Sequence, residues 1–92
     1  MKKIKTSERR IMLFLSEANK MLKYARMMSI KLDMDYGYML YILQTMVAKD
    51  WLITERSPAN PTRKYYQISL FGKKILDKIK DEVIENGNNP SN

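Results

Sequence analysis

Two short runs rich in β-branched and aromatic residues, separated by a break that contains prolines, constrain the fold of this chain most. Together they read ITERSPANPTRKYYQIS over residues 53–69. Such runs are typical of β-strands, and the prolines of the break fix two φ angles and cannot donate to a sheet ladder. The sequence therefore predicts a hairpin of WLITERS (51–57) and TRKYYQIS (62–69), with Arg56, Arg63 and Lys64 around its tip. Tyr65 and Tyr66 alternate across the second strand, so one of them is expected to be buried.

Apolar residues at helical spacing predict two helices on the N-terminal side of this hairpin. One stripe at i, i+3, i+4 and i+7 comprises Ile11, Phe14, Leu15 and Ala18. Thr6 or Ser7 can cap this first helix, and Glu8 in its first turn suits the helix dipole. A second helix is expected from about Met21 to Ile30.

The third helix is expected from about Tyr36 to Lys49, with Asp35 as its N-cap. Its apolar face comprises Met39, Ile42, Leu43 and Met46. The opposite face is aromatic and polar, with almost no charge, and comprises Tyr36, Tyr38, Tyr41, Gln44 and Thr45. Ser69 after the hairpin can cap a last helix that continues to about Glu85. The predicted order is helix-helix-helix-strand-strand-helix, a mainly α fold with one β-hairpin (α+β).

The charge of the chain favours a polyanionic partner. Of its 92 residues, 17 are Lys or Arg and 10 are Asp or Glu, which gives a net charge of +7. Residues 1–76 hold fifteen basic and six acidic residues, so the positive field belongs to the body of the chain. Nucleic acid or an acidic membrane surface would be attracted to such a field, and we expect nucleic acid.

Composition excludes several kinds of chemistry. The sequence has no cysteine and no histidine, so we expect no disulfide, no metal site and no imidazole catalysis. A chain of this length has little room for an enclosed active site, so we also expect no catalytic residue, no cofactor and no enzyme activity. No apolar run approaches the ~20 residues of a membrane span, and IMLFL is too short for a signal peptide. We therefore expect a cytoplasmic protein with no membrane partner.

The segment ITERSPANPTRKYYQISLFGKKIL resembles the wing and following helix of MarR- and PadR-type transcription regulators. In these proteins a strand, a basic loop, an aromatic-rich return strand and a Ser/Thr-x-x-Gly helix start follow one another. MLYILQTMVAKDWLI is similar to the end of their recognition helix and its turn into the first wing strand. The match spans about Leu22 to Leu76 and implies a winged helix-turn-helix. Asp50 stands where such proteins usually carry glycine, and aspartate tolerates the left-handed conformation.

The resemblance implies a minimal, single-domain version of these regulators. The long flanking helices that form the ligand pocket and dimer interface of full-length MarR proteins have no counterpart in this sequence. We therefore infer no small-molecule ligand.

A winged helix places its third helix in a DNA groove and its hairpin against the neighbouring backbone. For this recognition helix we predict DNA contacts by Tyr36, Tyr38, Tyr41, Gln44 and Thr45. Gln can bond adenine bidentately, Thr can meet a thymine methyl, and tyrosine hydroxyls commonly bond phosphates. Phosphate contacts are predicted for Arg56, Arg63 and Lys64 of the wing and for Lys23, Arg26 and Lys31 near the second helix. The alternatives are a solvated hairpin whose charges prevent edge pairing, and tyrosines that belong to the core or to an interface.

The last helix carries an apolar stripe that can be used against the core of the domain or against a second subunit. Its members are spaced by three and four, as in the seam of a short coiled coil. Because the helix runs beyond the body that the other elements can cover, we expect a homodimer with an interface of Leu70, Phe71, Leu76, Ile79 and Val83. We expect one winged-helix domain at residues 1–86, with its dimerisation helix at about 70–86, and a disordered tail at 87–92.

These features predict a sequence-specific regulator of transcription that binds double-stranded DNA as a homodimer and represses by occluding a promoter. Its target would then be palindromic. The alternative is a winged-helix module for protein-protein interaction, in which the tyrosine face of the third helix binds a partner helix and DNA binding is incidental.

Overall fold

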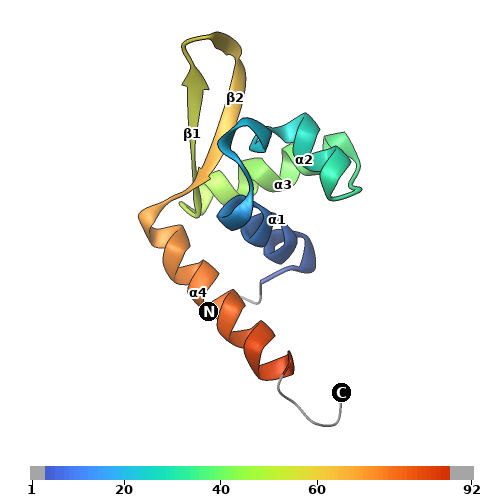
Figure 1. Cartoon of the computed structure of the whole chain (residues 1–92), viewed down its shortest axis with the longest axis vertical. Helices are drawn as coiled ribbons and strands as arrows, with labels where there is room; N and C mark the ends of the chain where they lie inside the picture. The colour runs from blue at the N-terminus through green and yellow to red at the C-terminus, as the bar shows by residue number, and fades with distance from the viewer. Residues whose placement is uncertain (1–3, 88–92) are drawn as a thin grey trace.

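The computed structural model describes residues 4–87, with side chains described for residues 4–82. Its elements are α1 (Thr6–Glu17), a 3-10 turn η1 (Lys20–Leu22), α2 (Ala25–Lys31), α3 (Tyr36–Ala48), β1 (Leu52–Ser57), β2 (Asn60–Ile68) and α4 (Leu70–Gly87). The first three helices form one body, from which the hairpin and α4 project at opposite ends (Figure 1). The molecule is accordingly elongated, with extents of 48, 26 and 22 Å. This order confirms the predicted fold class.

The first helix begins at Thr6, and Lys5 is its N-cap residue, so the prediction of a hydroxyl cap by Thr6 or Ser7 is wrong. A carboxylate oxygen of Glu8 instead accepts a hydrogen bond of 2.9 Å from the main-chain N–H of Lys5. Glu8 lies in the first turn of α1, as predicted, and its side chain is buried. Its burial makes it a packing residue, and its remaining oxygen needs a partner inside the protein.

The second predicted helix is wrong in its bounds, because the chain is extended between η1 and α2. The carbonyl of Lys23 accepts a hydrogen bond of 2.8 Å from the N–H of Tyr66, and Tyr24 pairs with Tyr65 as an antiparallel bridge. This pairing adds a short third segment beside β2 and leaves α2 with seven residues. Both Tyr65 and Tyr66 are buried, one more than expected, because the Tyr24 ring packs edge-on against Tyr65 at 5.8 Å between centroids.

The third helix has the predicted cap and face. A carboxylate oxygen of Asp35 accepts a hydrogen bond of 2.9 Å from the N–H of Tyr38, which satisfies one of the free donors of the first turn. The four predicted core residues, Met39, Ile42, Leu43 and Met46, are each 1% exposed or less. They join Ile11, Met12, Leu15 and Met28 in one core between the three helices. The orientation of α3 is therefore fixed, with its other face toward solvent.

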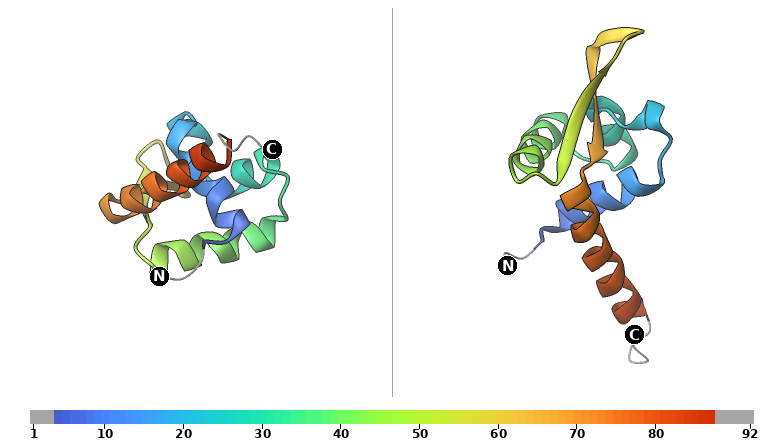
Figure 2. Two further views of the ribbon diagram at one scale, coloured as in Figure 1. Left: turned by 90° about the horizontal axis from the view of Figure 1, so that it is seen from below. Right: turned by 90° about the vertical axis from the view of Figure 1, so that its left-hand side faces the viewer.

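The hairpin pairs Leu52 with Ile68 near its base and Arg56 with Lys64 near its tip, and a bulge follows Arg56. It begins after Asp50, whose φ of 63° confirms the left-handed turn expected at this position. Leu52 and Trp51 are buried at the base of the hairpin. The wing is therefore anchored by its base, while its tip projects into solvent (Figure 2).

The apolar stripe of α4 packs against the core of its own chain. Ile79 is fully buried and Leu76 is 8% exposed, because this helix packs on α1 and β2. Leu76 and Ile79 are therefore corrected from dimer-interface residues to core residues. Leu70 and Phe71 remain exposed, at 82% and 45%. The side chain of Val83 and residues 88–92 of the predicted tail lie outside the described residues, while Gly87 still belongs to α4.

Candidate nucleic-acid interface

The outer face of α3 is uncharged along its whole length. Gly37, Tyr41, Gln44 and Ala48 recur at i, i+4, i+7 and i+11, directly opposite the buried residues, and all four are exposed. Tyr41 is 56% exposed, the highest value among the three tyrosines of this helix. This face can therefore offer hydrogen bonds and apolar contacts to a partner, but no charge attraction.

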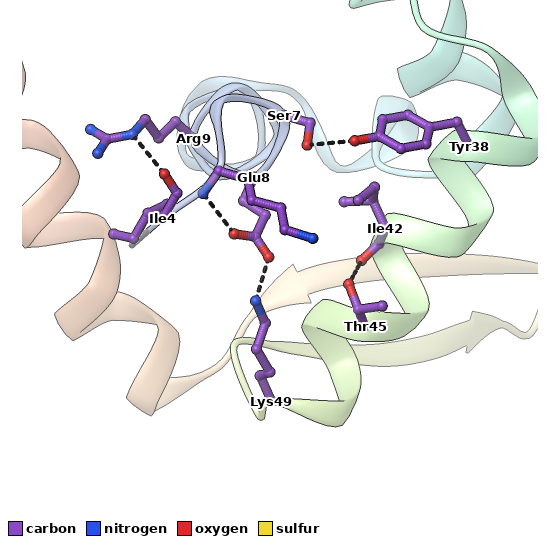
Figure 3. Close-up of polar contacts among 9 residues, drawn as sticks. Ile4, Ser7, Glu8, Arg9, Tyr38, Ile42, Thr45 and Lys49 are labelled. Atoms are coloured by element: carbon purple, nitrogen blue, oxygen red, sulfur yellow. Dashed lines mark hydrogen bonds and ion pairs between the residues drawn. The ribbon is translucent and has the colours of Figure 1, made fainter. Parts of the chain in front are cut away.

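The predicted recognition residues divide between the two flanks of this face. Tyr36 and Gln44 line a groove between α3 and the wing. Tyr38 lies on the opposite flank, where its hydroxyl forms a hydrogen bond of 3.2 Å with the hydroxyl of Ser7 in α1 (Figure 3). Thr45 is half-buried on the same flank, and its hydroxyl donates to the carbonyl of Ile42 at 2.7 Å. Tyr41 and Gln44 are consequently the predicted residues that face outward most directly.

A groove between α2, α3 and the wing is lined by positively charged side chains. Its volume is about 390 Å³, and its lining includes the four cations Arg26, Arg56, Arg63 and Lys64. No carboxylate is found among its lining residues. Within the described residues, none of these four cations forms an ion pair with Asp or Glu. A cationic groove without internal counter-charges is suited to a polyanion.

Two arginines of the groove are held against tyrosine rings. The guanidinium carbon of Arg26 lies 4.6 Å from the ring centroid of Tyr36, and that of Arg63 lies 4.1 Å from the centroid of Tyr24. A guanidinium stacked in this way keeps its N–H edge available for phosphate oxygens and loses less side-chain entropy when it binds them. Both arginines are therefore partly fixed in position before any partner arrives.

The wing tip carries the third arginine in a fixed position. A guanidinium nitrogen of Arg56 donates to the main-chain carbonyl of Pro61 at 3.1 Å, across the turn of the hairpin. On the other strand, Lys64 pairs with Arg56 in register and is exposed. Strand pairing thus brings together two of the wing residues that the sequence indicated.

Lys23 and Lys31 do not take part in the groove. Lys23 contributes its carbonyl to the pairing with β2, and its side chain is half-buried. Lys31 is exposed in the last turn of α2, where its positive charge interacts favourably with the helix dipole. Neither residue lies among those that line the groove.

Tyr24 is a groove residue that the sequence did not indicate. It separates η1 from α2, and its ring contacts both Arg63 and Tyr65. No local pattern indicates this role, because the extended conformation at this point results from pairing with β2.

The acidic residue of the wing, Glu55, is paired with a lysine outside the groove. Glu55 lies 2.8 Å from the ammonium of Lys20, and this hydrogen bond lowers the pKa of the Glu55 carboxyl. Gln67 also donates to this carboxylate. Glu55 therefore stays ionised and paired away from the groove, so the groove keeps its net positive charge.

Tyr66 lies in the wall between the groove and the core. Burial raises the pKa of its phenol above the ordinary value of 10, so the side chain stays neutral. The ammonium of Lys64 lies 5.9 Å from the Tyr66 ring centroid. Tyr66 thus places a neutral, buried aromatic ring beneath the cationic side of the wing.

Two further features concern the described part of the chain alone. Its His, Cys, Asp and Glu side chains nowhere gather in a group of three that could hold a metal ion. None of its helices combines the length and the apolar character that a membrane crossing demands.

No protein-family model and no curated protein sequence matches this chain. Among solved structures, the adhesin competence repressor AdcR from Streptococcus pyogenes matches with a TM-score of 0.80 at 15% identity and covers 94% of this chain and 62% of its own. The transcriptional repressor CouR from Rhodococcus jostii RHA1, bound to a 23-mer DNA duplex, matches with a TM-score of 0.80 at 13% identity, with coverages of 89% and 56%. The MarR family transcription regulator SP03579 gives 0.81 at 19% identity, with coverages of 90% and 54%.

This chain therefore spans less than two-thirds of the length of the regulators that it matches. The order of its helices and strands matches that of these winged-helix regulators. The chain accordingly has the winged-helix fold of the MarR-type regulators.

Proposed function

We propose that this protein is a transcription regulator that binds double-stranded DNA, with α3 in the major groove and the wing against the adjoining backbone. The observation that carries the proposal is the groove between α3 and the wing, which is lined by four cations and by no carboxylate. The uncharged face of α3 lies beside this groove. Attraction and base reading are thus assigned to neighbouring surfaces that meet at Gln44.

Phosphate contacts are assigned to Arg26, Arg56, Arg63 and Lys64. Arginines that are stacked or bonded before binding hold their donors in a fixed geometry, which suits the regular spacing of phosphates. Such contacts provide affinity and salt dependence without choosing a sequence. Lys23 and Lys31 can add long-range attraction, but they lie outside the groove.

Base contacts are assigned to Gln44 and Tyr41, with Tyr36, Tyr38 and Thr45 at the margins. Gln44 is exposed next to the cationic groove, and its amide can pair bidentately with adenine in the major groove. Tyr38 and Thr45 already have hydrogen-bond partners inside the protein. They therefore have less capacity to read a base than Gln44 has.

The regulator acts as a homodimer in this proposal, with Leu70 and Phe71 at the interface. These two side chains are exposed side by side at the start of α4, at the end of the wing opposite its tip. A two-fold axis near them would place two copies of α3 on one side of a duplex, about one helical turn apart. The solved CouR structure contains a DNA duplex, which supports DNA as the partner of this fold.

Selection of bound duplexes from a random-sequence pool tests the proposal directly. At about 150 mM salt the screening length is ~8 Å, so weak charge attraction alone retains little DNA. The expected result is an enriched palindrome with half-sites ~10 base pairs apart. An enriched single half-site would retain the regulator and remove the dimer. A pool without enrichment would contradict the proposal and leave the exposed tyrosines Tyr38 and Tyr41 as a surface for a protein partner.

A further inference from the structure

The first turn of α1 is bonded to both ends of α3 (Figure 3). The hydroxyl of Ser7 meets the hydroxyl of Tyr38, which lies in the first turn of α3. The next residue, Glu8, forms an ion pair with Lys49, which is the C-cap residue of α3. Two adjacent residues of one helix thus hold the helix to which we assign base reading.

The same turn also reaches α4. The guanidinium of Arg9 is paired with the carboxylate of Glu82, and another nitrogen of the same group donates to the carbonyl of Ile4 at 3.3 Å. The side chains of Arg9 and Glu82 are 28% and 43% exposed, so this contact lies at the surface. Exposed ion pairs contribute little to stability, and we assign no positioning role to it.

The pair of Glu8 with Lys49 is different, because its carboxylate is buried. Glu8 is 1% exposed, and its two oxygens are used by the N–H of Lys5 and the ammonium of Lys49. A buried carboxylate that loses its partner is costly, so the chain is constrained to keep the end of α3 where the ammonium can reach it. A buried ion pair adds little stability over a well-packed apolar pair, and its best attested use is to fix one arrangement among several.

Lys49 is held from a second side. Its ammonium lies 3.9 Å from the ring centroid of Trp51, which is buried at the base of the wing. The ammonium therefore lies between a carboxylate of α1 and the aromatic ring of the residue that precedes β1. The Lys49 side chain thus connects the end of α3 to α1 and to the base of the wing.

We propose that Glu8 and Lys49 are positioning residues for DNA recognition: their ion pair sets the angle at which α3 and the wing are presented, without contact with DNA. This inference rests on the proposed function. Glu8 cannot touch a duplex because it is buried. Lys49 is 40% exposed, but its charge is occupied by Glu8 and Trp51.

The test compares Glu8→Gln, Lys49→Met and the double variant with Lys80→Met, which removes one positive charge from the exposed side of α4. For each protein the affinity for the selected duplex and for a scrambled duplex is measured at several salt concentrations. Glu8→Gln and Lys49→Met are each expected to lower the ratio of the two affinities about three- to tenfold, and the double variant no further, because coupled residues are not additive. Lys49→Arg is expected to keep the affinity ratio of the wild type, because arginine still offers a cation to the buried carboxylate.

The salt dependence distinguishes positioning from a direct contact. If Lys49 bound a phosphate, Lys49→Met would weaken binding to both duplexes equally and lower the salt slope by about one unit. That result, or an unchanged affinity ratio in Glu8→Gln, would overturn the inference and leave the DNA-binding proposal standing. A wild-type protein that does not distinguish the two duplexes would instead contradict the proposed function.

A measurement without DNA tests the ion pair itself. Trp51 is the single tryptophan of the chain, so its emission reports the position of the nearby ammonium. Glu8→Gln is expected to shift this emission in proteins that remain folded by circular dichroism, whereas Lys80→Met leaves it unchanged. If Glu8→Gln leaves the Trp51 emission unchanged, the buried carboxylate does not hold Lys49 and the inference fails, whether or not the protein binds DNA.

Discussion

Gly72 lies directly against the main-chain carbonyl of Trp51, so that a Cβ atom at position 72 would come within 2.0 Å of that oxygen. Ser69 joins the same contact, because its hydroxyl accepts from the N–H of Gly72 at 2.8 Å and donates to the carbonyl of Asp50. We expect Gly72→Ala to lower the free energy of unfolding by about 1–3 kcal/mol or more, because two backbone segments would have to separate. Urea unfolding followed by circular dichroism measures the loss.

Gly37→Ala is the matched control for this substitution. A Cβ atom there would meet only a carboxylate oxygen of Asp35, at 3.2 Å, and that side chain can move. Because alanine is a better helix former, the expected change is between zero and about 1 kcal/mol of stabilisation. Equal tolerance of alanine at both positions would show that α4 does not sit on the turn after α3.

Substitutions of apolar residues in α4 are expected to have different effects at buried and at exposed positions. Ile79→Ala is expected to lower the free energy of unfolding by about 2–5 kcal/mol, because it empties a fully buried site. Leu70→Ser with Phe71→Ser is expected to weaken self-association, because these apolar side chains are exposed. Urea unfolding measures the first effect and sedimentation velocity the second. If the double variant and the wild type sediment alike, positions 70 and 71 are outside the interface.

Tyr66 predicts a loss of stability in alkaline solution. Burial raises the pKa of its phenol above the unfolded value of 10, so the unfolded chain releases this proton more readily than the folded chain does. The contribution to stability is therefore complete below pH ~10 and declines as the pH rises through the folded pKa. Tyr66→Phe is expected to lose less stability than the wild type between about pH 8 and pH 11, as measured by urea unfolding at each pH. Parallel pH profiles would contradict a buried phenol at this position.

The parts of the fold that depend on neighbours in sequence were predictable. The N-cap at Asp35 and the apolar face of α3 follow from spacing within one helix, and the strands from residue type and prolines. The break at Tyr24 was not predictable. The extended backbone there results from pairing with Tyr65, which follows α3 in the sequence. A local helical pattern carries no information about such a partner.

The candidate interface was predictable to a similar extent. Exposure of Tyr41 and Gln44 follows from the position of the core residues on the same helix. The ion pair of Glu8 with Lys49 joins residues 41 positions apart, and no pattern in either segment indicates it. The stripe with Ile79 has the same spacing whether it faces the core or a second subunit, and the packing on α1 decides in favour of the core.

Removal of the wing cations is expected to lower the affinity for DNA without a change in sequence preference. Arg63→Ala combined with Lys64→Ala is expected to weaken binding to all duplexes about equally and to lower the salt slope by about two units, one for each lost phosphate contact. Fluorescence anisotropy with two unrelated duplexes between about 50 and 200 mM salt, the range in which such contacts change affinity strongly, measures both quantities. Lys74→Ala with Lys80→Ala removes the same charge from the exposed side of α4 and should leave the slope nearly unchanged. Equal slopes for the two double variants would remove the wing from the interface.

Gln44 predicts the opposite behaviour, a change in sequence preference at nearly constant nonspecific affinity. Its amide is exposed at the edge of the cationic groove, and a bidentate contact to one base pair contributes ~1–3 kcal/mol of discrimination. Gln44→Ala should therefore relax preference at one position of the selected duplex, measured by affinities for all four base pairs at each position. Thr45→Ala is the neighbouring control, because the Thr45 hydroxyl is already bonded to the Ile42 carbonyl. If Thr45→Ala relaxes the preference and Gln44→Ala does not, the flank of α3 toward α1 reads the bases, and α3 lies in the groove rotated from the orientation proposed here.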